Sequence, residues 1–301
     1  MMPPDLADLD AFVAVAQSRS FRGAAALRNV SASSLSETIR RLEGRLGVRL
    51  LNRTTRSVTP TEAGLRLLER LQPALGEVAA ALDTINDFRG TPTGTLRLNV
   101  PTIVARHILP PIVSRFLAAY PGIAMEVIGN DTFIDILAAG FDAGVRYDER
   151  LERDMVRVPI GPRRQWFRCG AAPAYLARRG RPEHPNDLLQ HDCIRHRFAS
   201  GISPAWEFER GDEVVRIVPQ GPLVSNTTEM QLHAAVSGLG LLCTFAETLD
   251  AALVSGTLVE VLRDWSPGFS GPYLYYASRD HMPAPLRTFI DFIKAEGAEM
   301  A

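Results

Sequence analysis

Residues 31–47 restrict the fold of this chain more than any other stretch. Apolar residues recur there at steps of four, three and four, which places them on one stripe of an α-helix: Leu35, Ile39, Leu42 and Leu46. Ser31 is suited to cap the start of this helix, and Gly47 is suited to end it. The other face is small, polar or basic and consists of Ser33, Ser34, Glu37, Thr38, Arg40 and Arg41. The pattern predicts an amphipathic helix with its polar face open to a partner.

Two more helices and a hairpin are expected around it. Residues 6–17 have apolar positions at helical spacing, and the Ala-rich stretch 21–28 follows Ser20, a suitable N-cap. Two short helices joined by a tight turn describe a helix-turn-helix, whose second helix would enter the DNA major groove by its N-terminal end. The β-prone residues 48–58 then predict a wing, from which Arg53 and Arg56 can reach phosphates or the minor groove.

The charge of this region fits a polyanionic partner. Nine arginines and only two glutamates lie between Arg19 and Arg56, although the whole chain carries a formal net charge of −1. A basic segment in a near-neutral chain indicates one surface that meets a polyanion. Two alternatives remain: a coding bias toward Arg and Ala explains the arginines, and a solvated helical bundle with a charged hairpin explains the pattern.

A long helix is expected next. Thr59 is suited to cap it, Pro60 to occupy its first position, and Glu62 to complete a capping box. A seam of apolar residues then alternates in steps of three and four: Leu68, Leu71, Leu75, Val78, Leu82 and Ile85. Such a seam predicts pairing with a second long helix, and so a dimer. The alternative is a single amphipathic helix packed on its own domain, and residues 89–94 form the best linker in the chain.

Strands and helices alternate in the remaining two-thirds. Strands are expected at 96–100, 124–129 and 142–146, with helices at 103–119 and 132–139 between them. A second unit of this kind runs from about 165 to 265, and a final strand and helix would return to the first unit. This order implies mostly parallel sheets covered on both faces, and hence an α/β fold.

The stretch SFRGAAALRNVSASSLSETIRRLEGRLGVRLLNRTTRSVTPTEAG resembles the N-terminal domain of LysR-type transcriptional regulators. LNVPTIVARHILPPIVSRFLAAYPGI, GFDAGVR, LERDMVRVPIG, AVSGLGLL and LYYASR are similar to the effector domain of that family, so the resemblance covers nearly the whole chain. RTTRSV and LYYASR are similar to its large proteobacterial branch with mostly unassigned effectors.

The resemblance implies three parts. They are a winged helix-turn-helix at 1–59, a linker and dimerisation helix at 60–90, and an effector-binding domain at 91–301 that resembles type II periplasmic binding proteins. Its lobe I would span about 94–163 and 268–301, and its lobe II about 164–267. The family's DNA-contacting positions correspond to Ser31, Ala32, Ser33, Ser34, Glu37, Thr38 and Arg41. Ala32 and Glu37 depart from the commoner choices, so the target sequence stays open.

The effector site is expected in the cleft between the lobes, at the carboxyl ends of strands. Pro101, Thr102 and Ile103 begin a helix there, whose N-terminus suits an anion, and Arg146 could pair with a carboxylate. Asn226, Thr227 and Thr228 repeat this geometry in lobe II, and Phe198 would line the mouth. We expect a small anionic or aromatic molecule. Ordinary helix capping or surface ion pairing explains each residue equally well.

The expected partners are promoter DNA, further copies of this chain in a dimer or tetramer, a small-molecule effector and RNA polymerase. No apolar run suggests a membrane span, and the acidic start MMPPDLADLD does not resemble a signal peptide, so we expect a cytoplasmic protein. A solute-binding protein and an enzyme on a two-lobe fold are the alternatives, but no catalytic motif, cofactor motif or paired metal cluster is visible. The three cysteines are expected to be buried and inert, with redox sensing as the alternative.

Overall fold

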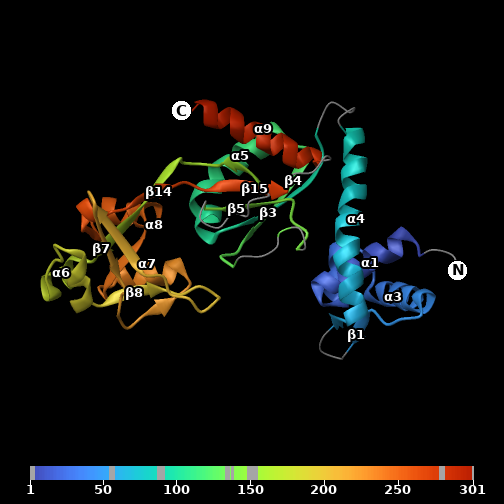
Figure 1. Cartoon of the computed structure of the whole chain (residues 1–301), viewed down its shortest axis with the longest axis horizontal. Helices are drawn as coiled ribbons and strands as arrows, with labels where there is room; N and C mark the ends of the chain where they lie inside the picture. The colour runs from blue at the N-terminus through green and yellow to red at the C-terminus, as the bar shows by residue number, and fades with distance from the viewer. Residues whose placement is uncertain are drawn as a thin grey trace.

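The computed structural model describes residues 4–53, 58–86, 92–132, 136, 139–147, 155–277 and 282–299. Three separate hydrophobic clusters organise it, one in the N-terminal part and one in each of two α/β lobes. In Figure 1 lobe II lies at the left, lobe I lies in the middle, and the N-terminal helices lie at the right.

The N-terminal part contains three short helices, a two-stranded wing and one long helix. These are α1 (Leu6–Ser18), α2 (Phe21–Arg28), α3 (Ala32–Leu46), β1 (Leu51–Arg53), β2 (Val58–Pro60) and α4 (Glu62–Asn86). The predicted caps of α2 and α3 are confirmed, since Ser20 Oγ accepts from the Gly23 N–H and Ser31 Oγ accepts from the Ser34 N–H. Gly47 ends α3 with a φ of 68°.

The predicted start of α4 is wrong by two residues. Thr59 and Pro60 belong to the wing, where they pair with Asn52 and Leu51. Thr61 supplies the cap instead, because its Oγ1 accepts from the Gly64 N–H at 3.0 Å. The Thr61 N–H also donates to the Leu50 carbonyl, which ties the helix start to the wing. Strand pairing therefore takes the residues that local sequence assigns to the helix.

Lobe I contains a five-stranded sheet in the order β4-β3-β5-β15-β6. Its elements are β3 (Gly94–Val100), a π-helical turn η2 (Val104–Ile108), α5 (Leu109–Ala119), β4 (Ile123–Gly129), β5 (Ala143–Arg146), β6 (Met155–Pro159), β15 (Tyr273–Ala277) and α9 (Ala284–Glu299). The helix predicted at 103–119 is confirmed, since residues 102–119 are helical without a break and the π-helical turn η2 lies inside this range. The helix predicted at 132–139 falls mostly outside the described residues.

Lobe II contains a sheet in the order β11-β8-β12-β7-β13, with β14 also paired to β7. Its elements are β7 (Arg164–Ala171), α6 (Pro173–Arg179), η4 (Pro185–Gln190), β8 (Cys193–His196), β9 (Trp206–Arg210), β10 (Glu213–Ile217), β11 (Val224–Ser225), α7 (Thr228–Val236), β12 (Leu241–Phe245), α8 (Ala246–Val254), β13 (Val259–Val261), η5 (Arg263–Trp265) and β14 (Gly268–Ser270).

Both sheets are mixed, whereas the sequence predicts mostly parallel sheets. Strands β3, β4 and β5 run parallel, but β15 pairs antiparallel with β5 and β6. In lobe II, β7 pairs antiparallel with β12, β13 and β14. The chain crosses between lobes through β7 and through β14 and β15, so these strands enter each sheet from the other lobe. The predicted return of the C-terminal strand to lobe I is confirmed.

Candidate functional site

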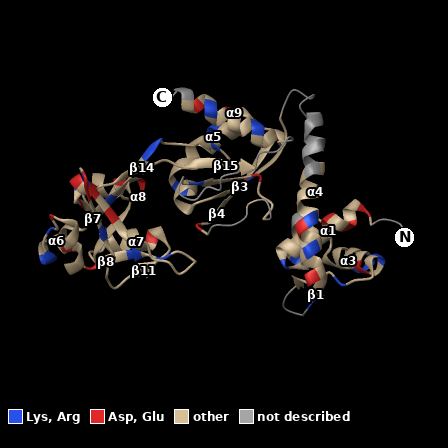
Figure 2. Cartoon of the chain, viewed as in Figure 1, with Lys and Arg blue, Asp and Glu red and all other residues tan. Residues whose placement is uncertain are grey.

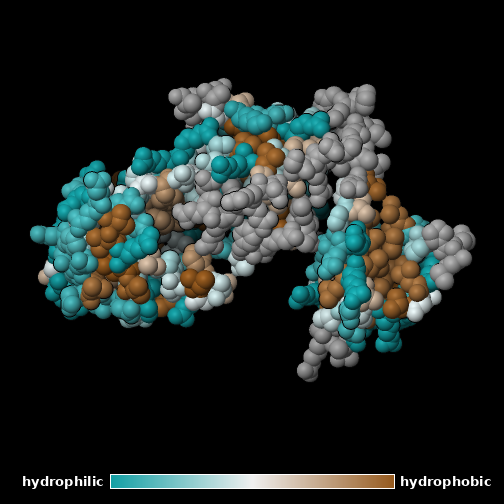
Figure 3. Space-filling view, viewed as in Figure 1, coloured by the Kyte–Doolittle hydropathy of each residue, from teal (hydrophilic) through white to brown (hydrophobic). Residues whose placement is uncertain are grey.

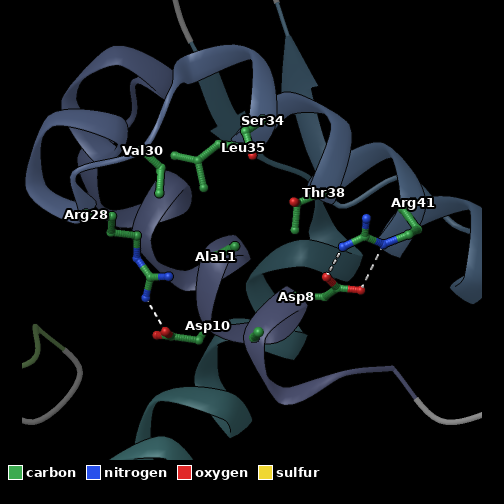
Figure 4. A pocket seen from close by; sticks show the side chains of 10 residues that line it. Asp8, Asp10, Ala11, Arg28, Val30, Ser34, Leu35, Thr38 and Arg41 are labelled. Carbon is green, nitrogen blue, oxygen red and sulfur yellow. Dashed lines mark hydrogen bonds and ion pairs between the residues drawn. The ribbon is translucent and has the colours of Figure 1, made fainter.

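The polar face of α3 divides into two stripes. Ser33, Glu37 and Arg40 are exposed and form the outer stripe. Ser34, Thr38 and Arg41 border a groove of about 430 Å³ between α3 and α1 (Figure 4). Among the other predicted contacts, Ser31 caps the helix and Ala32 is half-buried. The structure thus divides the predicted DNA-binding residues of α3 between an outer stripe and the border of a groove, in a part of the chain where acidic and basic residues are interspersed (Figure 2).

An ion pair closes each end of the groove. Arg28 pairs with Asp10 at one end, and Arg41 pairs with Asp8 at the other (Figure 4). The Asp8 pair raises the pKa of Arg41, chiefly through the side-chain hydrogen bond. Arg41 is therefore charged and held by one edge of its guanidinium, a restraint that the sequence pattern of α3 does not reveal.

Arg53 is held inside the domain by three contacts. Its Nη2 donates to Glu43 Oε2 at 2.9 Å, its Nη1 donates to Ser36 Oγ at 3.3 Å, and its guanidinium lies 5.2 Å from the Phe21 ring centre. Glu43 Oε1 also accepts from the N–H groups that precede and begin β1. Arg53 thus joins the wing to α3, and its contact with DNA stays a prediction. Arg56 lies outside the described residues.

The apolar seam of α4 has two environments. Leu68, Leu71 and Leu75 pack against the core of the N-terminal part. Val78 lies further along and is 41% exposed, and the side chains of Leu82 and Ile85 lie outside the described part of the chain. Apolar side chains gather beside α4 in the space-filling view (Figure 3). The first half of the seam therefore serves this domain's own core, and pairing with a second chain stays a prediction.

In lobe I the predicted anion site already contacts a carboxylate. The Thr102 N–H donates to Asp131 Oδ1 at 2.8 Å, just before η2. Pro101 is buried, and the half-buried Ile103 packs on the lobe core. Any anionic ligand at this N–H would compete with Asp131. Asp131 lies two residues after the end of strand β4, a position that could have indicated it from the sequence.

Arg146 is 5% exposed and bonded within lobe I. Its Nη2 donates to Asn99 Oδ1 at 2.6 Å and to the Thr132 carbonyl at 3.2 Å. Its Nη1 donates to the carbonyl of Val145 at 2.7 Å. These bonds join β3, β5 and the segment after β4. Arg146 therefore stabilises the packing of these segments within lobe I. Its predicted role in effector binding remains untested.

The predicted residues of lobe II lie at the start of α7 and on the loop after β8. Asn226 and Thr227 are exposed, Thr228 is the first residue of α7, and the Thr227 N–H donates to Ser225 Oγ at 2.9 Å. Phe198 packs edge-on against His196, with ring centres 4.7 Å apart. Burial lowers the pKa of His196, and the charge of Asp131 opposes that shift. The structure thus brings Asn226, Thr227 and Thr228 together at the start of α7.

Sequence reasoning missed the polar chain that joins the lobes. Tyr147 Oη donates to Gln165 Oε1 at 2.9 Å, and Gln165 Nε2 donates to Glu247 Oε1 at 2.8 Å. Burial is the main reason why the pKa of Tyr147 is raised, and the nearby Glu247 adds to it. Phe167, Phe245 and Phe269 pack together beside Tyr147. These residues are distant in sequence and have no shared spacing, so no local signal connects them.

A second contact between the lobes is an ion pair of Arg106 on η2 with Glu229 on α7. Burial and the charge of Arg106 lower the pKa of the neighbouring His107. A basic residue of η2 in lobe I thus pairs with an acidic residue of α7 in lobe II. Interruption of regular α-helix by a π-helical turn is frequent at functional sites.

Acidification is expected to destabilise the lobes. Burial lowers the pKa values of His107, His191 and His196 in the folded protein, while the pKa of a histidine in the unfolded chain is about 6.5. Below that pH the unfolded chain binds more protons than the folded one, so the free energy of unfolding falls as the pH falls. Thermal unfolding of the full chain from pH 7 to pH 5 measures this.

Variants of the same histidines give the control for the acid effect. All six histidines lie between residues 107 and 281, so the N-terminal part has none. His107→Gln should therefore reduce the pH dependence of the lobe transition and leave that of the N-terminal part unchanged. A lobe stability that rises on acidification would contradict the shifts.

The cysteines lie on three adjacent strands of lobe II. Cys169 and Cys193 are buried, and burial raises the pKa of Cys193 to about 12 and that of Cys169 well above its usual value. Cys243 is only half-buried and lies opposite Cys169 in the β7–β12 register. Two cysteines thus match the predicted burial, and the third is more accessible. Within the described residues, no group of three or more His, Cys, Asp or Glu could hold a metal ion.

Comparisons with known proteins agree on both halves of the chain. Residues 6–65 match the family described as bacterial regulatory helix-turn-helix protein, lysR family, and residues 89–298 match the LysR substrate binding domain. The HTH-type transcriptional regulator YcaN of Escherichia coli strain K12 is 41% identical over 293 residues, covering 97% of this chain and 96% of YcaN.

Two further comparisons extend over nearly full length. The HTH-type transcriptional regulator PgrR of the same E. coli strain is 37% identical, covering 99% of this chain and all of PgrR. The full-length structure of the Vibrio cholerae virulence activator AphB, a member of the LTTR protein family, superimposes with a TM-score of 0.66 at 26% identity. That match covers 97% of this chain and 99% of AphB.

Proposed function

Since this chain belongs to the LysR family of bacterial transcriptional regulators, we propose that it binds promoter DNA as a dimer or tetramer and responds to a small-molecule effector between its lobes. It is a transcriptional regulator with a DNA-binding helix-turn-helix and an effector-binding domain. Among the helices that the structure describes, none is long and apolar enough to cross a membrane. The proposal includes action in the cytoplasm, because a regulator of this family must reach promoter DNA there.

The observation that carries the DNA-binding proposal is the exposed outer stripe of α3. Ser33, Glu37 and Arg40 are all exposed on a helix whose start is capped and whose opposite face is buried in the core. A rigid helix with short polar side chains near its N-terminus is suited to the major groove. Arg40 adds a cation for a phosphate, and Glu37 can accept from a cytosine amino group.

Nuclease footprinting on DNA that flanks the gene tests this function. We expect protection of two half-sites related by a two-fold axis, since a dimer presents two copies of α3. Protection should weaken steeply with salt, because each neutralised phosphate releases counterions. If flanking DNA is not protected, selection from random duplexes follows. Failure to enrich any sequence there would overturn the proposal.

Arg40→Ala is expected to reduce the salt dependence of binding. If Arg40 neutralises one phosphate in each half-site of the dimer, the slope of log K against log salt should become less steep by about 1.8. Affinity should fall by similar factors on specific and scrambled duplexes, because a phosphate contact carries no base information. Fluorescence anisotropy at several salt concentrations measures both quantities.

Arg216→Ala is the matched control for Arg40→Ala. Arg216 lies on β10 of lobe II, where its side chain is 74% exposed and pairs with Glu207. Its removal changes the net charge equally but should leave the slope unchanged. Equal effects of the two substitutions would remove Arg40 from the interface.

For oligomerisation, the proposal rests on α4. Its exposed apolar residues include Leu65 at 49% and Val78 at 41%, and a second copy of α4 would cover such side chains. Light scattering on the purified chain distinguishes a monomer from a dimer or tetramer. We also propose that the DNA-bound protein contacts RNA polymerase, because such a contact would allow it to change transcription.

For the effector, the structure favours an apolar or aromatic molecule with hydrogen-bond donors. Asp131 already accepts from the Thr102 N–H, and Glu247 and Asp131 are the charges that act on Tyr147. Phe198, Asn226 and Thr227 would contact the molecule from lobe II. Its binding must favour one DNA-bound arrangement over another to have an effect. Compounds that change the footprint identify it.

A further inference from the structure

A buried carboxylate lies behind the recognition helix. Asp8, in the first turn of α1, is only 2% exposed. A buried carboxylate needs charged or hydrogen-bonding partners, and two arginines of α3 supply them. Arg41 Nη2 donates to Asp8 Oδ1 at 2.5 Å and Arg41 Nε donates to Asp8 Oδ2 at 3.4 Å, while Arg45 Nη1 lies 3.5 Å from Asp8 Oδ2.

The contact uses one edge of the Arg41 guanidinium. Arginine carries five N–H donors in a planar fork, and the Nε–Nη2 edge faces Asp8. The third nitrogen points away from the carboxylate in Figure 4. Half of the Arg41 side chain is exposed, and it borders the groove together with Ser34 and Thr38. The guanidinium is therefore fixed on one side and open on the other.

We propose that Asp8 is a positioning residue, which orients Arg41 so that the outer edge of its guanidinium reads a guanine in the major groove. The two acceptors of guanine, O6 and N7, match the spacing of an arginine fork. An arginine that is already held loses less rotamer freedom when it binds, so the contact is pre-organised. This inference rests on the proposed DNA binding and adds a residue of α1 to its specificity.

Electrostatics alone predicts the opposite effect of Asp8. A carboxylate next to two arginines reduces the positive potential of the DNA-facing surface, so its neutralisation should strengthen binding to any DNA. A positioning role predicts weaker binding to the specific sequence instead. The two explanations therefore differ in sign, which makes the substitution Asp8→Asn informative.

The matched control is Asp10→Asn. Asp10 lies on the same helix and pairs with Arg28 at the other end of the groove, with 47% of its side chain exposed. Both substitutions remove one negative charge and preserve the shape of the side chain. Of the two carboxylates, only Asp8 contacts an α3 residue predicted to bind DNA, namely Arg41, so the two variants separate positioning from charge.

The experiment uses the full-length protein and two DNA probes. One is a duplex that the wild-type protein selects from a random library, and the other is a scrambled duplex of equal composition. We expect Asp8→Asn to lower the ratio of specific to scrambled affinity by about tenfold or more, since a bidentate arginine contact discriminates bases by that order. Asp10→Asn should leave the ratio unchanged. Substituting each guanine of the selected duplex should reveal one position where only the wild type has a preference.

Two further measurements separate the possible failures. Thermal unfolding verifies that Asp8→Asn is folded, and an Arg41→Ala background should abolish the effect of Asp8→Asn on the ratio. Equal or stronger specific binding by Asp8→Asn overturns the inference, as does an equal loss on both duplexes. Failure of the wild-type protein to select any sequence overturns the proposed function itself.

Discussion

Gly64→Ala is expected to destabilise the N-terminal part by about 3 kcal/mol, because the change places a methyl group inside a backbone contact. Gly64 lies in the first turn of α4, and a Cβ there would meet the Leu50 carbonyl oxygen at 2.1 Å. That carbonyl also accepts from the Thr61 N–H, so the clash would separate the wing from α4. Thermal unfolding followed by circular dichroism measures the loss, and specific DNA binding should fall with it.

Gly44→Ala is the matched control and should act in the opposite direction. Gly44 lies inside α3, and a Cβ there would meet nothing within 4 Å. Alanine in an open helical position stabilises by about 0.5–1 kcal/mol relative to glycine. Equal stability of the Gly64→Ala variant and the wild type would show that the wing and α4 are not packed as described.

Arg146→Ala is expected to destabilise lobe I by about 3 kcal/mol, whatever its effect on a ligand. The substitution would leave buried acceptors of Asn99 and Val145 without their donor, and each such group costs about 1–3 kcal/mol. Arg146→Lys should recover only part of the loss, because an ammonium group cannot reproduce the fork. Chemical denaturation of the full chain measures the free energy of unfolding.

Arg97→Ala is the control for Arg146→Ala. Arg97 lies on β3 of the same sheet, pairs with Glu126 at 3.0 Å, and has 53% of its side chain exposed. Such surface ion pairs contribute about 0–1 kcal/mol. If Arg146→Ala were as mild as Arg97→Ala, the arginine would be dispensable for the lobe and available to the effector.

Local sequence predicted the helices and their ends well where each end depends on a few adjacent residues. Ser20, Ser31 and Gly47 act as predicted, since each cap bonds a backbone group only three or four residues away. The start of α4 was misplaced because Thr59 pairs with Asn52 across the wing, a choice made at a distance. For the same reason the sequence did not reveal the antiparallel crossing strands.

The predicted functional residues divide in the same way. The polar stripe of α3 follows from helical spacing and lies where expected. The contacts of Arg41 and Arg53 are made with Asp8 on α1 and Glu43 on α3, which helical spacing does not connect to them. Tyr147, Gln165 and Glu247 were absent from the prediction because their contact joins three distant segments.

The sequence by itself determined the order of helices and strands up to residue 129, the polar face of α3 and, through its motifs, the family. Each of these depends on spacing along the chain, where neighbours are known in advance. Only the tertiary structure decided which polar groups are partners. Asp8 pairs with Arg41, Asp131 accepts from the Thr102 N–H, and Arg106 pairs with Glu229. Such partners are selected when separate elements pack and buried polar groups must be satisfied, and no periodicity in the chain encodes that choice.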